Sequence, residues 1–257
     1  MKKSVYILLI IPLLFTACAK DAPDSGSFDD FMEEWGLSVY SLNVCTSVQD
    51  AVKYPEPWTA EVAATFVIPD ETVHSMSTCG LLETLLEHPT NRMLGPWCTI
   101  CSSLSYPGVT NFNQVLQGNK VAIELFKRSD CASVLASKYL DFIKNKKEIS
   151  GQIKYFEMLL SSDMCMGTLS ETEKIQLIAM ALERTKYDEE RVNETCHIMI
   201  AIMQSCDYAP FCEEVSPKLQ ETTFGYTLSE DAYSNLVGSY TDLIIRYAKQ
   251  FLNDLKL

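Results

Sequence analysis

Apolar residues recur at spacings of three and four along most of this 257-residue chain, and this periodicity constrains the fold more than any other feature. The segment from Ser229 to the C-terminus shows it best, with a stripe of Tyr233, Leu236, Tyr240, Leu243, Tyr247 and Phe251. Such spacing places apolar side chains on one face of an α-helix. No segment has the sustained strict alternation of a half-buried strand. The sequence predicts an all-α fold: a compact irregular array of antiparallel helices, or a short solenoid.

Capping residues indicate where the other helices begin. Ser27 with Asp30, and Ser170 with Glu173, have capping-box spacing. Further caps are expected at Thr59, Ser77 or Thr78, Asn119, Ser129 and Ser150. One predicted helix starts at Ser27. The others span 59–66, 69–76, 78–88, 109–117, 119–128, 130–144, 151–161, 171–185, 188–204 and 229–257. Residues 37–57 and 89–107 are predicted to be irregular. His88 precedes Pro89 at a helix end, where we expect it to interact as a cation with the helix dipole.

The first 18 residues have the layout of a secretory signal peptide. Lys2 and Lys3 are followed by an apolar run over residues 5–15 and then by small residues before Cys18. The run rises only about 16 Å as a helix, roughly half the hydrocarbon thickness of a bilayer, so it is too short to span one. We therefore expect residues 1–17 to be removed.

The segment Phe15-Thr16-Ala17-Cys18 resembles the lipobox of bacterial lipoproteins, although Phe15 stands where that family most often has Leu. The resemblance implies that the Cys18 thiol carries diacylglycerol and that cleavage leaves Cys18 as the new N-terminus. Two or more acyl chains, such as palmitate, hold a protein stably on a membrane. The expected organisation is a signal peptide (1–17), a tether after the lipidated cysteine (18–27) and a single all-α domain (28–257).

The segment Cys18-Ala19-Lys20-Asp21-Ala22 resembles in part the export signal of surface lipoproteins of Bacteroidota-type bacteria. It implies anchoring to the outer membrane and display at the cell surface. Residues 19–27 are polar enough to form a solvated tether in either case. Removal of residues 1–17 leaves 19 basic and 34 acidic side chains, a net charge of −15. This balance argues against a nucleic-acid partner, because phosphate contacts need clustered Lys and Arg.

Two further segments resemble a group of uncharacterised Bacteroidota lipoproteins. One is Ile68-Pro69-Asp70-Glu71, which leads into Met76-Ser77-Thr78 and Leu81-Leu82-Glu83-Thr84. The other is Phe126-Lys127-Arg128-Ser129-Asp130, before Val134-Leu135 and Lys138-Tyr139. The resemblance covers residues 58–140. It implies secretion and a helical fold, and it carries no catalytic residues.

Nine cysteines remain after Cys18: Cys45, Cys79, Cys98, Cys101, Cys131, Cys165, Cys196, Cys206 and Cys212. The odd count leaves at least one without an intramolecular disulfide partner. An exported chain can form disulfides, and Cys206 and Cys212 flank a short Pro-containing loop that a bridge would close. Cys196 lies on an apolar helix face, which predicts a buried thiol. We expect between zero and three disulfides.

The segment Trp97-Cys98-Thr99-Ile100-Cys101 resembles the Trp-Cys-x-x-Cys site of thioredoxin-like proteins. That family has a strand before the motif and a cis-proline loop well after it, and neither is predicted here. The same pair would form half of a zinc site, with Cys79, Cys131 and His74 as candidates for the other half. A redox or metal-binding protein that uses Cys98 and Cys101 is therefore the alternative interpretation, and we assign no cofactor.

The sequence contains no nucleophile elbow, zinc-protease helix motif or phosphate-binding Gly loop. Trp35, Trp58 and Trp97 lie in or beside the less regular first 110 residues, and Tyr54 is close to Trp58. If these aromatic residues are exposed, they would stack on sugar rings. If they are buried, they would close the ends of the helical array, and this second role is favoured because Trp is usually buried. We expect a lipid-anchored, non-enzymatic binding module of the cell envelope with a protein or glycan partner.

Overall fold

The computed structural model describes residues 27–42, 44–89, 113, 116–145, 151–186, 192–221 and 230–255. Every regular element in these ranges is a helix, and no strand occurs among them. This confirms the all-α class. No helix within the same ranges combines the length and the apolar content that crossing a bilayer requires.

The elements within the described ranges are one short 3-10 helix, η1 (Leu37–Val39), and a series of α-helices. The α-helices are α1 (Phe28–Glu34), α2 (Ala60–Thr65), α3 (Asp70–Ser75), α4 (Thr78–Leu86), α8 (Lys120–Leu125), α9 (Cys131–Lys144), α10 (Gly151–Leu160), α11 (Asp163–Thr168), α12 (Glu171–Thr185), α13 (Val192–Ser205), α14 (Ala209–Glu214), α15 (Ser216–Glu221) and α16 (Glu230–Leu255).

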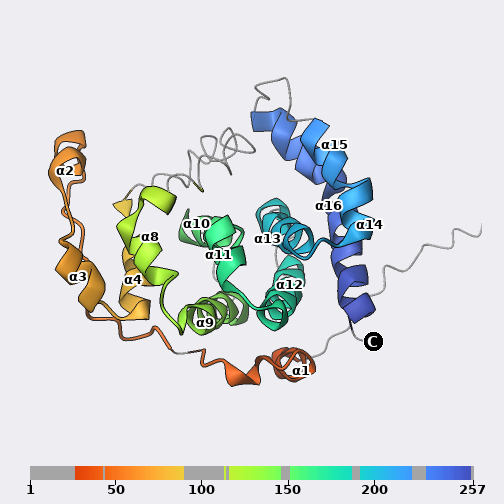
Figure 1. Ribbon diagram of the computed structural model, residues 1–257, viewed down its shortest axis with the longest axis horizontal. Coiled ribbons are helices and arrows are strands. Elements are labelled where there is room, and N and C mark those ends of the chain that lie inside the picture. The colour runs from red at the N-terminus through yellow and green to blue at the C-terminus, as the bar shows by residue number, and fades with distance from the viewer. Residues whose placement is uncertain are drawn as a thin grey trace, which may run out of the picture.

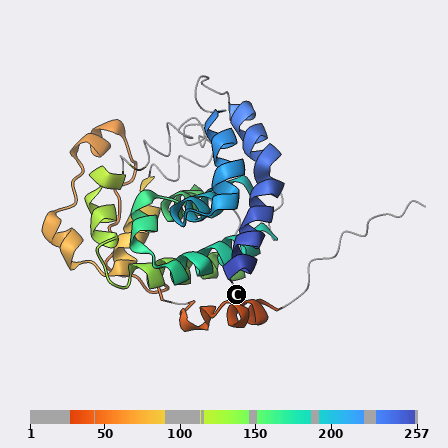
Figure 2. The same ribbon diagram turned by 45° about the vertical axis from the view of Figure 1, so that its right-hand side comes forward.

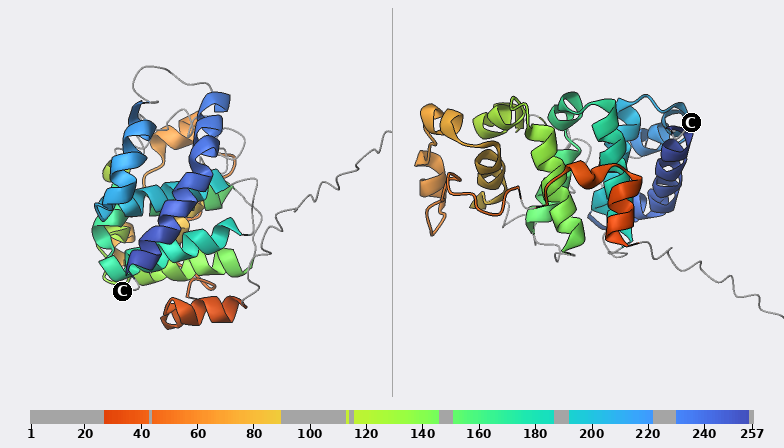
Figure 3. Two further views of the ribbon diagram at one scale, coloured as in Figure 1. Left: turned by 90° about the vertical axis from the view of Figure 1, so that its right-hand side faces the viewer. Right: turned by 90° about the horizontal axis from the view of Figure 1, so that it is seen from below.

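The helices follow one another along the long axis of the molecule in chain order (Figures 1 and 3). α2 and α3 lie at one end, α14 to α16 lie at the other, and α4 and α8 to α13 fill the space between them. α1 and η1 depart from this order and lie beneath α9 and α12 (Figures 1 and 2). The Gln176 amide of α12 holds them there, because it donates to the Trp35 and Gly36 carbonyls and accepts from the Tyr40 hydroxyl at 2.6 Å.

The core follows the predicted apolar stripes. α13 packs against α10, α12 and α16, and its residues Cys196, Met199 and Met203 are fully buried. The stripe of α16 buries Tyr247 and Phe251, which lie four residues apart as one helix face requires. These residues are core rather than part of a cofactor site.

The predicted caps are confirmed at five helix starts. Ser27 with Asp30 and Ser170 with Glu173 form complete capping boxes, while Thr59, Ser77 and Asn119 accept hydrogen bonds from the first turns of α2, α4 and α8. Each cap satisfies backbone N–H groups that have no partner within the helix. The predicted caps are therefore correct where the side chain is free to hydrogen-bond to the first turn of its own helix.

Other boundaries differ from the prediction. Asp130, not Ser129, is the N-cap residue of α9, and its carboxylate accepts from the Thr78 hydroxyl at 2.5 Å instead of capping. α8 ends at Leu125, before the predicted residue 128, and Pro69 precedes α3 as its N-cap residue. α11, α14 and α15 were not predicted; unlike α2, α3 and α8, which also have six residues, none of them had a start signal identified in the sequence. The cap at Ser150 and most of the helix over 109–117 lie outside the described residues.

Candidate functional site

A groove of about 1000 Å³ lies between an irregular segment and the helices α4 and α9. We call residues 45–58 the strap, because this segment runs beside α4 and forms one wall of the groove. The other wall is polar. The groove is lined by Cys45, Thr46, Val48, Gln49, Ala51, Val52, Lys53, Tyr54, Pro55, Glu56, Pro57, Trp58, Glu83, Glu87, Pro89 and Lys138.

The start of the strap is bound to the N-terminal end of α4. A disulfide joins Cys45 to Cys79. The Asp50 carboxylate accepts from the Ser77 backbone N–H at 2.5 Å and from the Ser77 hydroxyl at 3.0 Å, and these bonds lower the pKa of Asp50. The absence of a side chain at Gly80 makes room for this contact, because a Cβ atom there would require the Asp50 carboxylate to move.

The middle of the strap is bound to Thr84, a buried residue in the second turn of α4. The Val52 backbone N–H donates to the Thr84 hydroxyl at 2.9 Å, and the Tyr54 hydroxyl donates to the Thr84 carbonyl at 3.0 Å. The strap thus runs in the same direction as α4 and contacts it at successive turns.

The end of the strap packs into a cluster of four rings, which we call the aromatic cluster: Tyr54, Trp58, Phe66 and His88. Tyr54 and Trp58 meet edge to face with ring centroids 5.6 Å apart. His88 contacts both, at 4.9 and 5.5 Å, and Phe66 does so at 5.4 and 5.6 Å. Burial raises the pKa of Tyr54 to about 12.

His88 does not have the predicted role of a cation at a helix end. Burial lowers its pKa below the usual 6.5, because an imidazolium among aromatic rings would lose its hydration. The neutral ring packs against Tyr54 and Trp58 instead. His88 therefore helps to hold the aromatic cluster together.

The polar wall of the groove comes from α4 and α9. Glu83 forms an ion pair with Lys138, and only 18% and 15% of these side chains is exposed. Lys138 also lies 5.5 Å above the Phe142 ring. Glu87, one turn after Glu83, accepts a hydrogen bond from the Gln152 amide of α10. This wall therefore presents two carboxylates and one ammonium group to the groove.

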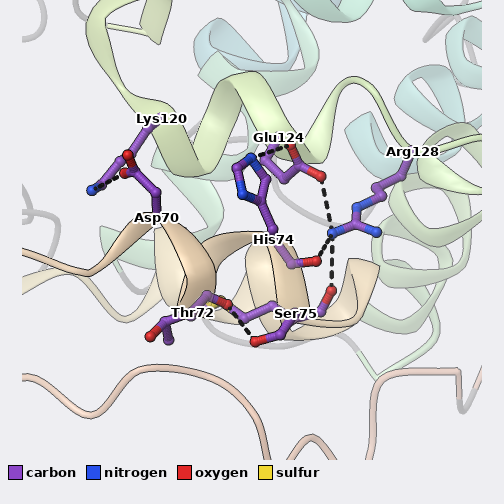
Figure 4. Close-up of polar contacts among 8 residues, drawn as sticks. Asp70, Thr72, His74, Ser75, Lys120, Glu124 and Arg128 are labelled. Carbon is purple, nitrogen blue, oxygen red and sulfur yellow. Dashed lines mark hydrogen bonds and ion pairs between the residues drawn. The ribbon is translucent and has the colours of Figure 1, made fainter.

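A second polar cluster joins α3 to α8 (Figure 4). Arg128 donates to the His74 and Met76 carbonyls at 2.9 and 3.2 Å and pairs with Glu124 at 3.0 Å. Lys120 pairs with Asp70 at 2.6 Å, and the His74 ring faces Glu124 at 3.7 Å (Figure 4). These contacts explain the position of α3, and they place His74 in an ion-pair cluster.

The predicted zinc partners of Cys98 and Cys101 are not brought together. Cys79 is bonded to Cys45, and burial raises the pKa of Cys131 to about 12, which disfavours the thiolate that binds metal. Among the described residues, no group of His, Cys, Asp and Glu has the geometry of a metal site. Cys98 and Cys101 themselves lie outside the described residues.

No bridge closes the loop between Cys206 and Cys212, and both are free thiols. Asp207 takes a φ of 48°, and the turn leads directly into α14. There the Cys212 sulfur lies 4.0 Å from the Met203 carbonyl, whereas the Cys206 sulfur contacts the Ser205 hydroxyl. Cys196 is buried as predicted.

The two described tryptophans differ in their surroundings. Trp35 packs against the core beside α12, as expected for a residue that closes the array, while Trp58 lines the groove. Tyr54 and Trp58 were predicted from the sequence as candidate binding residues, whereas Glu83, Glu87 and Lys138 were not. Their only signal was the spacing of Glu83 and Glu87, four residues apart on one helix face. Trp97 and the anchor residue Cys18 lie outside the described residues.

Comparison with known proteins finds no relative: no family model, no curated protein and no solved structure matches this chain. The groove and the N-terminal sequence are therefore the features that bear on function.

Proposed function

We propose that the protein is a lipid-anchored, non-enzymatic binding module of the outer cell envelope, and that the groove holds its protein or glycan partner. The groove is the observation that supports binding. Its volume of about 1000 Å³ is at the upper end of the range for ligand sites. The strap contributes the Tyr54 and Trp58 rings, and the opposite wall carries convergent polar groups, which are features of such sites.

The disulfide between Cys45 and Cys79 supports export. Disulfides persist in oxidising compartments outside the cytoplasm and are rare within it. A signal peptide that ends at Cys18 would deliver the chain to such a compartment, and the lipid on Cys18 would retain it at the outer membrane. The polar residues 19–27 would then separate the folded part from the membrane.

The polar groups of the groove favour binding over catalysis. The Glu83 carboxylate is paired with Lys138, and the Glu87 carboxylate accepts from Gln152. A glycosidase needs one carboxylic acid that donates a proton and one carboxylate held free to act as a base or nucleophile. Groups already engaged with a cation and an amide are better suited to hydrogen-bond a ligand.

The anchor is tested by replacing Cys18. Cells that express the full chain are fed an alkyne analogue of palmitate, and label and membrane fractionation are measured. We expect the wild-type protein to be labelled and to sediment with membranes, and Cys18→Ala to lose both properties. Cys212→Ala, which removes a cysteine far from the N-terminus, is the matched control and should keep both. Equal labelling of Cys18→Ala and wild-type protein would refute the anchor.

The groove is tested by photo-cross-linking in intact cells of the native host. A benzophenone amino acid at the exposed groove residue Gln49 should give an adduct whose added mass identifies the partner. The adduct should disappear when Trp58→Ala is introduced. The same probe at Thr172, which is exposed on α12, should give none. Identical adducts from both positions, or none from Gln49, would count against a binding role for the groove.

A further inference from the structure

The aromatic end of the groove is held rigid before any ligand arrives. Tyr54 and Trp58 both line the groove and are half-buried, so each ring is supported on one side and accessible on another. Phe66 and His88 support them from the remaining sides of the aromatic cluster, and the Tyr54 hydroxyl is fixed to the Thr84 carbonyl. A ligand that stacks here loses little affinity to side-chain ordering.

The polar wall restricts the charge of the ligand. Glu83 and Lys138 neutralise each other, so this part of the groove has no excess of either sign. A polyanion would meet the Glu56, Glu83 and Glu87 carboxylates, and a polycation would meet the Lys53 and Lys138 ammonium groups. An uncharged ligand avoids both costs, because burying an unpaired charge is expensive.

Uncharged hydroxyl groups match this wall. A hydroxyl donates and accepts, so it can donate to a Glu83 or Glu87 oxygen while it accepts from the Lys138 ammonium. Adjacent hydroxyls on a rigid ring would meet the two carboxylates and the ammonium group together. The apolar faces of the same rings match the Tyr54 and Trp58 side chains.

From this complementarity we propose that the groove binds a neutral oligosaccharide, with sugar rings stacked on Trp58 and Tyr54 and hydroxyls bonded to Glu83, Glu87 and Lys138. The groove volume of about 1000 Å³ favours several sugar units over one. The inference rests on the proposed binding function and specifies its ligand class. An extended peptide is the competing occupant.

The test uses the full chain, purified in a detergent without a sugar headgroup, and isothermal titration. The neutral probes are maltohexaose, cellohexaose and xylohexaose; hexagalacturonate and hexalysine are the anionic and cationic probes. We expect at least one neutral hexasaccharide to bind with a Kd of about 1 mM or tighter, and neither charged probe to bind as well. The bound sugar should be recovered unhydrolysed.

Variants then locate the site. Trp58→Ala should weaken binding of that hexasaccharide by at least about tenfold, and Trp58→Phe, which keeps a ring, by less. Glu87→Gln keeps the size of the side chain and tests the polar wall without disturbing the aromatic cluster. Phe28→Ala and Lys120→Gln are matched controls, since they remove a half-buried ring and an ion-pair partner away from the groove. Circular dichroism confirms that each variant is folded.

Three results would overturn the inference: no neutral hexasaccharide binds, a charged probe binds more tightly, or Trp58→Ala and Glu87→Gln both bind as the wild-type protein does. If the groove still forms a cross-link to a protein in cells, the binding function stands and only the ligand class is wrong. If the cross-link is also absent, the proposed function itself fails.

Discussion

At the scale of single residues, Thr84 binds the middle of the strap to α4. It is fully buried, its hydroxyl accepts from the Val52 N–H, and its carbonyl accepts from the Tyr54 hydroxyl. Thr84→Val keeps the shape of the side chain but leaves the Val52 N–H without this acceptor. We expect a loss of about 1–2 kcal/mol in the free energy of unfolding, measured with urea. Thr65→Val, at an exposed position, should change it by less than about 0.5 kcal/mol.

His88 makes a second prediction, on pH. Its pKa is lower in the folded than in the unfolded protein because of burial. The unfolded state therefore binds the proton first as pH falls, and the contribution of His88 to stability declines below about pH 6.5. His88→Phe keeps a ring in the aromatic cluster and removes the titration. The difference in unfolding free energy between wild type and variant should be constant above pH 6.5 and move against the wild type below it. A difference that does not vary between pH 5 and 8 would contradict the assignment.

At the scale of an element, α12 depends on its capping box. Ser170 and Glu173 satisfy each other's backbone N–H groups at the start of this helix, which packs against α9, α13 and α16. Ser170→Ala should cost about 1 kcal/mol of unfolding free energy, because one N–H loses its acceptor. Ser47→Ala, an exposed serine that caps no helix, is the control and should be near neutral. An equal effect of both would show that the cap does not stabilise α12.

At the scale of the whole molecule, a buried polar network joins four helices. The Glu157 carboxylate of α10 accepts from the Tyr139 hydroxyl of α9 at 3.0 Å and the Thr195 hydroxyl of α13 at 3.1 Å. It also lies 3.9 Å from Arg184 of α12. All four side chains are buried, and desolvation with the nearby Glu157 charge raises the pKa of Tyr139. The network therefore fixes how α9, α10, α12 and α13 meet.

Removing the carboxylate from this network should be costly. Glu157→Ala takes the acceptor from two buried hydroxyls and the counter-charge from Arg184, and we expect a loss of about 3 kcal/mol in unfolding free energy. Glu33→Ala, which removes an exposed carboxylate of α1, should cost less than about 0.5 kcal/mol. A loss for Glu157→Ala as small as that of the control would show that the network contributes specificity rather than stability.

The helical class and most helix starts follow from the sequence alone. Periodicity of three and four and caps such as Ser27, Thr59, Ser77 and Ser170 act within about one turn of chain, so they are visible without knowledge of the fold. The stripe of α13 identified core residues for the same reason. Asp130 shows the limit, because a partner 52 residues away on α4 takes the carboxylate that would otherwise cap α9.

Only the tertiary structure decided the groove. The pairing of Cys45 with Cys79 spans 34 residues, and Glu83 meets Lys138 across 55. Periodicity carries no information on which distant segments meet, and nine cysteines permit many pairings. His88 was predicted to be a cation from its position at a helix end. Its pKa is instead lowered by burial, and Tyr54 and Trp58 of the strap pack against its ring. Local patterns determined the helices, and contacts between distant segments determined the site.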